Sequence, residues 1–155
     1  MDSLEIKIAK ILKRKKKTLA VAESCTGGLI ASRITDISGS SRYFSGGVVA
    51  YSNDVKTSVL KVPQSLIKEY GAVSRQVAQS MAEGIKAELD SDVAAAVTGI
   101  AGPTGGSASK PVGTAYIAVV SGKRKKTKKV NFKGTRREIK QKFAEAVLKL
   151  IAENI

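Results

Sequence analysis

The sequence predicts an α/β fold, a three-layer α/β/α sandwich in which helices cover both faces of a mixed sheet. Short apolar runs alternate with stretches in which apolar residues recur every three or four positions, which is typical of strands followed by helices. The run 93–97 is apolar throughout, as expected for a strand covered on both faces. The chain has 155 residues, a single-domain length, so we expect one domain over 1–155.

The first third of the chain contains two predicted helices and two predicted strands. Apolar residues at helical spacing mark both helices, and the first helix ends in a basic run that suits the negative end of the helix dipole. The predicted elements are a helix over 3–14, a strand over 18–22, a helix from 29, a loop over 36–41 and a strand over 44–51.

The remaining elements continue the alternation and end in an antiparallel hairpin. Small polar residues at 52–54 and Ser74 are candidate helix caps, and Pro63 suits the first turn of a short helix. The predicted elements are helices from 55, over 63–70 and over 74–89, a strand over 93–97, strands over 113–120 and 128–132 around a turn at 121–123, and a helix from 135.

The chain has no histidine and a single cysteine, Cys25. One cysteine excludes an internal disulfide, and the lack of histidine removes the usual base of serine and cysteine hydrolases and the commonest zinc ligand. We therefore expect no metal. A lysine with a lowered pKa becomes the most plausible base for any serine nucleophile. No apolar run is long enough to span a membrane and no signal segment is present, so we expect a cytoplasmic protein without a membrane partner.

The net charge of +14 is concentrated in two basic runs, 13–17 and 123–129. Such a charge is compatible with nucleic-acid binding. Neither run contains an aromatic residue for base stacking, however, and no recognised nucleic-acid-binding motif accompanies them. We interpret the runs as a solvated helix end and a hairpin tip, and expect no specific nucleic-acid partner.

The stretch 22–28 holds three candidate nucleophiles, Ser24, Cys25 and Thr26, where a buried strand turns into a helix. Backbone N–H groups at a helix start suit an oxyanion or a phosphate, so those near Cys25, Thr26 and Gly27 could hold a developing oxyanion. The simpler interpretation is that Ser24 or Thr26 only caps the helix.

Two further segments follow strand ends and should lie near this turn. Tyr51 and Lys56 follow the strand 44–51, and we expect Lys56 in the first turn of a helix, where the positive end of the dipole would lower its pKa. The glycine-rich loop 98–106 follows the strand 93–97, but its spacing matches neither a Rossmann turn nor a P-loop. Because ligands collect at the carboxyl ends of strands in open α/β sheets, these segments predict a site. The alternative is a cap, an edge tyrosine and a surface lysine.

The motifs at 22–28, 46–53, 98–103 and 110–114 together resemble the CinA C-terminal domain family. Members of this family are nicotinamide mononucleotide amidohydrolases. The resemblance covers nearly the whole chain and implies hydrolysis of the carboxamide of nicotinamide mononucleotide to nicotinate mononucleotide and ammonia, a salvage step toward NAD that needs no metal or cofactor.

Carried over by position, the resemblance makes Ser24 the nucleophile and Lys56 and Tyr51 its catalytic partners. It also implies a set of residues that line the mononucleotide site, namely Gly39, Ser41, Thr98, Gly99, Gly102 and Arg136. We expect a small-molecule nucleotide as the partner and a homo-oligomer as the assembly. Two other functions stay open, a non-catalytic nucleotide-binding module and a nucleic-acid-associated competence protein.

Overall fold

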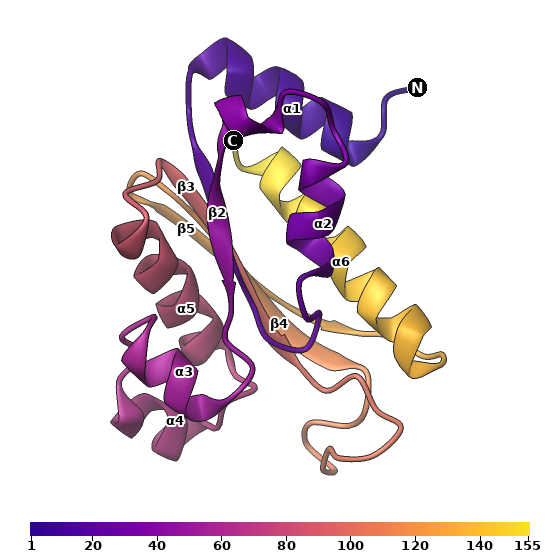
Figure 1. Cartoon of the computed structure of the whole chain (residues 1–155). Helices are drawn as coiled ribbons and strands as arrows, with labels where there is room; N and C mark the ends of the chain where they lie inside the picture. The colour runs from indigo at the N-terminus through magenta and orange to yellow at the C-terminus, as the bar shows by residue number, and fades with distance from the viewer.

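The computed structural model describes all residues 1–155 and places helices on both faces of a five-stranded sheet (Figure 1). The strands are β1 (Leu19–Glu23), β2 (Phe44–Val49), β3 (Val93–Gly99), β4 (Thr114–Ser121) and β5 (Arg124–Asn131). The helices are α1 (Leu4–Lys15), α2 (Leu29–Thr35), α3 (Asn53–Ser58), α4 (Gln64–Tyr70), α5 (Arg75–Glu88) and α6 (Arg136–Glu153), with a 3-10 turn η1 (Ser40–Arg42) before β2. The predicted single-domain α/β/α sandwich is confirmed.

The sheet is mixed, with strand order β2-β1-β3-β4-β5. β1 pairs in parallel with β2 and with β3, whereas β4 pairs antiparallel with β3 and with β5. Ala22 of β1 lies opposite Val48 on one side and Ala96 on the other. This register brings the carboxyl ends of the three parallel strands level. The segments that follow these strands therefore start at the same end of the sheet.

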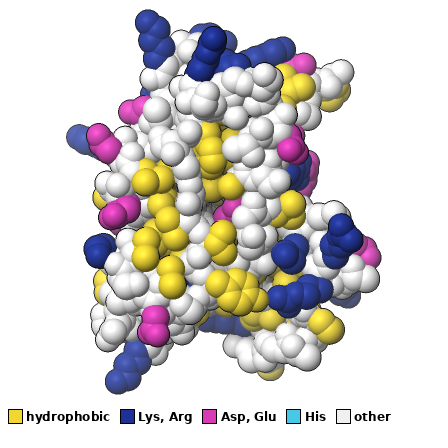
Figure 2. Space-filling model, in the orientation of Figure 1, with side chains coloured by type: hydrophobic (Ala, Val, Ile, Leu, Met, Phe, Trp, Pro, Cys, Tyr) yellow, Lys and Arg dark blue, Asp and Glu magenta, His cyan; other side chains and the backbone are white.

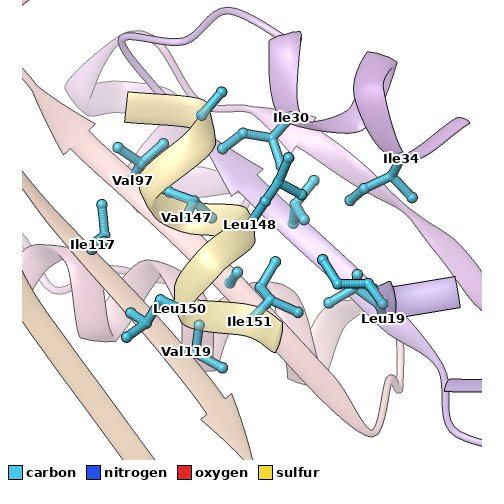
Figure 3. Packing of buried hydrophobic residues seen from close by; sticks show 14 of the residues in the cluster. Leu19, Ile30, Ile34, Val97, Ile117, Val119, Val147, Leu148, Leu150 and Ile151 are labelled. Atoms are coloured by element: carbon cyan, nitrogen blue, oxygen red, sulfur yellow. The ribbon is translucent and has the colours of Figure 1, made fainter. Parts of the chain in front are cut away.

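Two hydrophobic cores stabilise the sandwich, one on each face of the sheet. The larger core lies under α1, α2 and α6, and the smaller one lies under α4 and α5. Figure 3 shows Leu148 and Ile151 of α6 among Leu19, Ile30 and Ile34, all of them buried. Burial of each such side chain contributes about 1.5 to 3 kcal/mol, so the inward face of α6 accounts for its position on the sheet.

The second basic run differs from its prediction. It was expected at a hairpin tip before a strand over 128–132, but β5 already begins at Arg124 and the turn contains only Gly122 and Lys123. The run therefore forms most of an edge strand. Lysines tolerate this position because the outer edge and most of this strand face solvent, and their charges discourage pairing with another strand.

The first basic run lies where the sequence predicts it, at the end of α1. The helix ends at Lys15, and Lys16 adopts the left-handed conformation with φ 53° that closes many helices. Figure 2 shows Lys and Arg side chains gathered at the top of the molecule, where Figure 1 places α1. None of the helices combines the length and apolar character needed to cross a bilayer.

Candidate functional site

Glu23, the last residue of β1, stabilises the turn that follows this strand through hydrogen bonds. Its carboxylate is buried and accepts hydrogen bonds from Thr26 Oγ1 at 2.6 Å, from Ile30 N at 2.9 Å and from Ala31 N at 3.0 Å. Two of these donors are backbone groups in the first turn of α2, which otherwise lack partners within the helix. Glu23 thus fixes the turn that carries Ser24 to the helix that follows it.

Ser24 and Lys56 form the centre of the site. Lys56 Nζ donates a hydrogen bond to Ser24 Oγ at 3.0 Å, and both residues are buried, with exposed fractions of 7% for Ser24 and 2% for Lys56. The ammonium nitrogen also donates to the carbonyl oxygens of Ala50 at 2.9 Å and Tyr51 at 3.2 Å. No carboxylate pairs with it. The simpler interpretation of Ser24 as a helix cap does not hold, because the residue that caps α2 is Gly28.

Burial lowers the pKa of Lys56 below its ordinary value of 10.5, because an ammonium loses hydration in the protein interior. The expected cause, the positive end of a helix dipole, is wrong in its geometry. Ser52 caps α3 by accepting from Val55 N, so Lys56 is the fourth residue of a six-residue helix and falls in its last turn. A neutral amine 3.0 Å from a serine hydroxyl can accept its proton.

Tyr51 and Arg136 close the mouth of the site. The Tyr51 side chain is 60% exposed, and its phenol oxygen accepts a hydrogen bond from Arg136 Nη2 at 3.1 Å. Arg136 Nη1 donates to the carbonyl oxygen of Gly102 at 2.6 Å. Toward Lys56, Tyr51 presents its backbone carbonyl, not its phenol. The arginine therefore joins three segments that are far apart in the sequence.

Arg136 is held in place by the cap of its own helix. Thr135 Oγ1 accepts a hydrogen bond from Glu138 N at 3.2 Å and donates one to the Glu138 carboxylate at 3.0 Å, so Thr135 caps the start of α6. The first residue of the helix is thereby fixed in orientation. The guanidinium reaches across to Tyr51 and Gly102 from a rigid element.

The backbone of the turn offers two hydrogen-bond donors near Ser24. The N–H groups of Cys25 and Thr26 have no acceptor in the structure, and Cys25 lines the same recess as Ser24. Gly27, also expected to hold an oxyanion, does not fit: its N–H donates to the carbonyl oxygen of Ser24 at 3.1 Å, because the turn closes on itself. Cys25 and Thr26 are the remaining candidates from the predicted set.

The glycine-rich loop after β3 supplies the opposite wall. Thr98 is buried and donates to the carbonyl oxygen of Ala72 at 2.8 Å, which ties the end of β3 to the loop between α4 and α5. A Cβ on Gly99 would lie 2.6 Å from Ala115 Cβ, so glycine is needed for close packing against β4. Together with Gly102, these residues line the recess that contains Ser24 and Lys56.

Gly39 and Ser41 lie elsewhere in the chain fold. They belong to the turn that precedes β2, whereas Ser24 and Tyr51 follow the carboxyl ends of β1 and β2. Because β1 and β2 run in parallel, the turn before β2 lies at the amino ends of these strands, whereas the recess lies at their carboxyl ends. A single chain does not bring these two residues into the site.

The recess has a volume of about 290 Å³. No group of three or more His, Cys, Asp or Glu side chains lies close enough to hold a metal ion. Cys25, although adjacent to Ser24, is buried, and burial raises the pKa of its thiol to about 12. A thiol is a poor nucleophile compared with a thiolate, so Ser24 is the better candidate of the two.

Sequence reasoning missed two residues of this site. Glu23 was assigned no role from the sequence. An acidic residue that ends an apolar strand just before a helix could have indicated it, because a carboxylate there can accept hydrogen bonds from the first N–H groups of the helix. Asn53 lines the recess and lies between Tyr51 and Lys56 in the sequence, so its position in the motif could have indicated it.

Comparison with known proteins shows the family to which the chain belongs. The model of the CinA C-terminal domain matches residues 1–155. The chain belongs to the CinA C-terminal domain family. A CinA-like protein of Geotalea daltonii is 50% identical over 139 residues, and one of Thermotoga neapolitana is 43% identical over 154 residues. The matches cover 90% and 99% of this chain but only 34% and 38% of those relatives, so the chain spans about a third of their length.

Solved structures of the same family have the same fold over nearly the whole chain. The competence damage-inducible protein A of Klebsiella pneumoniae superposes with a TM-score of 0.94 at 32% identity, covering 97% of this chain and 94% of that one. A competence/damage inducible protein of Agrobacterium tumefaciens gives a TM-score of 0.93 at 36% identity, covering 99% and 96%.

Proposed function

We propose that the protein hydrolyses the carboxamide of nicotinamide mononucleotide to nicotinate mononucleotide and ammonia. The observation that carries the proposal is the buried Ser24–Lys56 pair, with 3.0 Å between Oγ and Nζ and a lysine pKa lowered by burial. The family resemblance supports the pyridine nucleotide as substrate. The reaction needs no redox step, metal or cofactor, only a nucleophile, a base and an oxyanion site.

The first half of the reaction transfers the acyl group to Ser24. The neutral Lys56 amine accepts the Ser24 hydroxyl proton while Oγ attacks the carboxamide carbon and forms a tetrahedral intermediate. The N–H groups of Cys25 and Thr26 would bind the oxyanion. The Lys56 ammonium then gives its proton to the amide nitrogen, the C–N bond breaks, and ammonia leaves an ester on Ser24.

The second half returns the enzyme to its starting state. A water molecule gives a proton to Lys56 and attacks the ester carbon, and the tetrahedral intermediate collapses with return of the proton to Ser24 Oγ. Nicotinate mononucleotide leaves as the product. The carbonyl oxygens of Ala50 and Tyr51 hold Nζ in place throughout, since both accept hydrogen bonds from it.

Ammonia release is the direct test, with nicotinamide mononucleotide, nicotinamide riboside and nicotinamide compared side by side. We expect release from the mononucleotide, complete loss in Ser24→Ala, and survival of activity in the matched variant Cys25→Ser. Ser24→Ala should keep its fold, because the hydroxyl is not a helix cap. Full activity in Ser24→Ala would overturn the mechanism, and loss in Cys25→Ser alone would move the nucleophile to the thiol.

A further inference from the structure

A second recess of about 630 Å³ adjoins the one that contains Ser24. One wall is the turn after β1, with Gly27 and Gly28, and the other is the first part of α6, with Arg137 and Lys140. Arg136 borders both recesses. Only one hydrophobic residue, Leu29, lines the second recess, so a polar occupant suits it better than an apolar one.

The second recess is lined by cations that have no acidic partner. Arg136, Arg137 and Lys140 form no ion pair, and no Asp or Glu lines the recess. Arg33 provides the contrast, because it lies nearby on α2 and pairs with both Glu5 and Glu145. Figure 2 shows Lys and Arg side chains gathered at the lower right, where Figure 1 places the start of α6 beside the turn after β1.

The turn leaves room for a ligand next to Lys140. Gly27 has a positive φ of 62° and no side chain, and a Cβ built there would lie 3.7 Å from Lys140 Nζ. The half-buried ammonium of Lys140 therefore lies next to the turn, on the wall of the second recess, where a ligand can reach it. Arg136 is already held by Tyr51 and Gly102, which leaves Lys140 and Arg137 as the cations free to bind a ligand.

We propose that Lys140 and Arg137 bind the phosphate monoester of the nucleotide substrate and so favour nucleotides over nucleosides. The inference rests on the proposed function, because it assumes that the carboxamide occupies the recess of Ser24 while the rest of the nucleotide passes Arg136. A phosphate dianion forms charge-assisted hydrogen bonds with lysine and arginine, and a nucleoside hydroxyl gains far less from the same groups.

Binding measured by calorimetry tests this assignment without consuming the ligand. The background is Ser24→Ala, and the ligands are nicotinamide mononucleotide and nicotinamide riboside at moderate salt. Lys140→Met preserves the length of the side chain and removes its charge. Lys149→Met is the matched control, since it also removes one positive charge from α6. Lys149 lies away from the second recess, in a separate pocket between α6 and β5.

We expect Lys140→Met to weaken mononucleotide binding by about tenfold or more, the factor typical of one lost charge-assisted hydrogen bond. Riboside binding should change by less than about twofold, and Lys149→Met should change neither. Adding Arg137→Met should deepen the loss for the mononucleotide alone. In the Ser24 enzyme, Lys140→Met should raise KM with little change in kcat.

An equal loss for both ligands, or no loss for either, would overturn the assignment. Its failure is distinguishable from failure of the proposed hydrolysis. A chain that binds the mononucleotide through Lys140 but releases no ammonia lacks the activity and keeps the phosphate site. A chain that releases ammonia while Lys140→Met binds both ligands normally has the activity and lacks this site, and absence of mononucleotide binding contradicts both.

Discussion

Glu23→Gln should destabilise the protein and slow its reaction, although it removes no atom that lines the recess. One carboxylate oxygen accepts from Thr26 and Ile30 and the other accepts from Ala31. A glutamine side chain has one acceptor oxygen, so in either orientation its NH₂ group faces at least one N–H donor. Leaving a buried donor unsatisfied costs about 1 to 3 kcal/mol, with more for a charged partner, so we expect a loss of about 2 to 3 kcal/mol.

Thermal unfolding followed by circular dichroism measures this loss. For a domain of this size each kcal/mol corresponds to about 2 to 4 °C, which gives a fall in Tm of about 4 to 12 °C. The turnover number should fall as well, because a small displacement of a nucleophile costs about a hundredfold in rate. Glu83→Gln is the matched control, since Glu83 is 40% exposed and pairs at the surface with Lys125. An unchanged Tm in Glu23→Gln would refute the reasoning.

The remaining predictions concern two groups whose pKa is shifted, Lys56 and Cys25. Burial lowers the pKa of Lys56, so the neutral base forms as pH rises and kcat/KM should increase with pH through an apparent pKa below 10.5. Arginine stays protonated, so Lys56→Arg should be nearly as inactive as Lys56→Ala, and retained turnover would show that only a positive charge is needed. Burial raises the pKa of Cys25 to about 12, so iodoacetamide at pH 8 should not alkylate the folded protein but should alkylate it after denaturation, as mass spectrometry would reveal. Rapid labelling of the folded chain would contradict the buried position of the thiol.

The sequence predicts the layers and the centre of the site because both depend on local patterns. Apolar spacing marks most of the helices and strands, and their alternation predicts the three α/β/α layers. Ser24 and Lys56 are 32 positions apart, yet each follows the end of a strand, so a parallel pairing is enough to bring them together. The absence of histidine then leaves lysine as the base.

The details that differ between the sequence-based expectations and the single chain depend on contacts that no local pattern records. The pKa of Lys56 is set by how deeply tertiary packing buries it, and the helix-dipole argument used only the position in sequence. The N–H of Gly27 is used inside the turn, which appears only once the backbone closes. Gly39 and Ser41 adjoin β2 in the sequence, but at its amino end, away from the recess.

The two edge strands of the sheet, β2 and β5, differ in charge. β5 carries five Lys and Arg side chains along its length, and an identical strand brought against it would meet like charge at short range. β2, at the other edge, contains only Phe, Ser, Gly and Val. If a second copy of this chain extends the sheet, electrostatic repulsion directs it to the uncharged edge, and the pairing then becomes insensitive to salt instead of requiring high ionic strength.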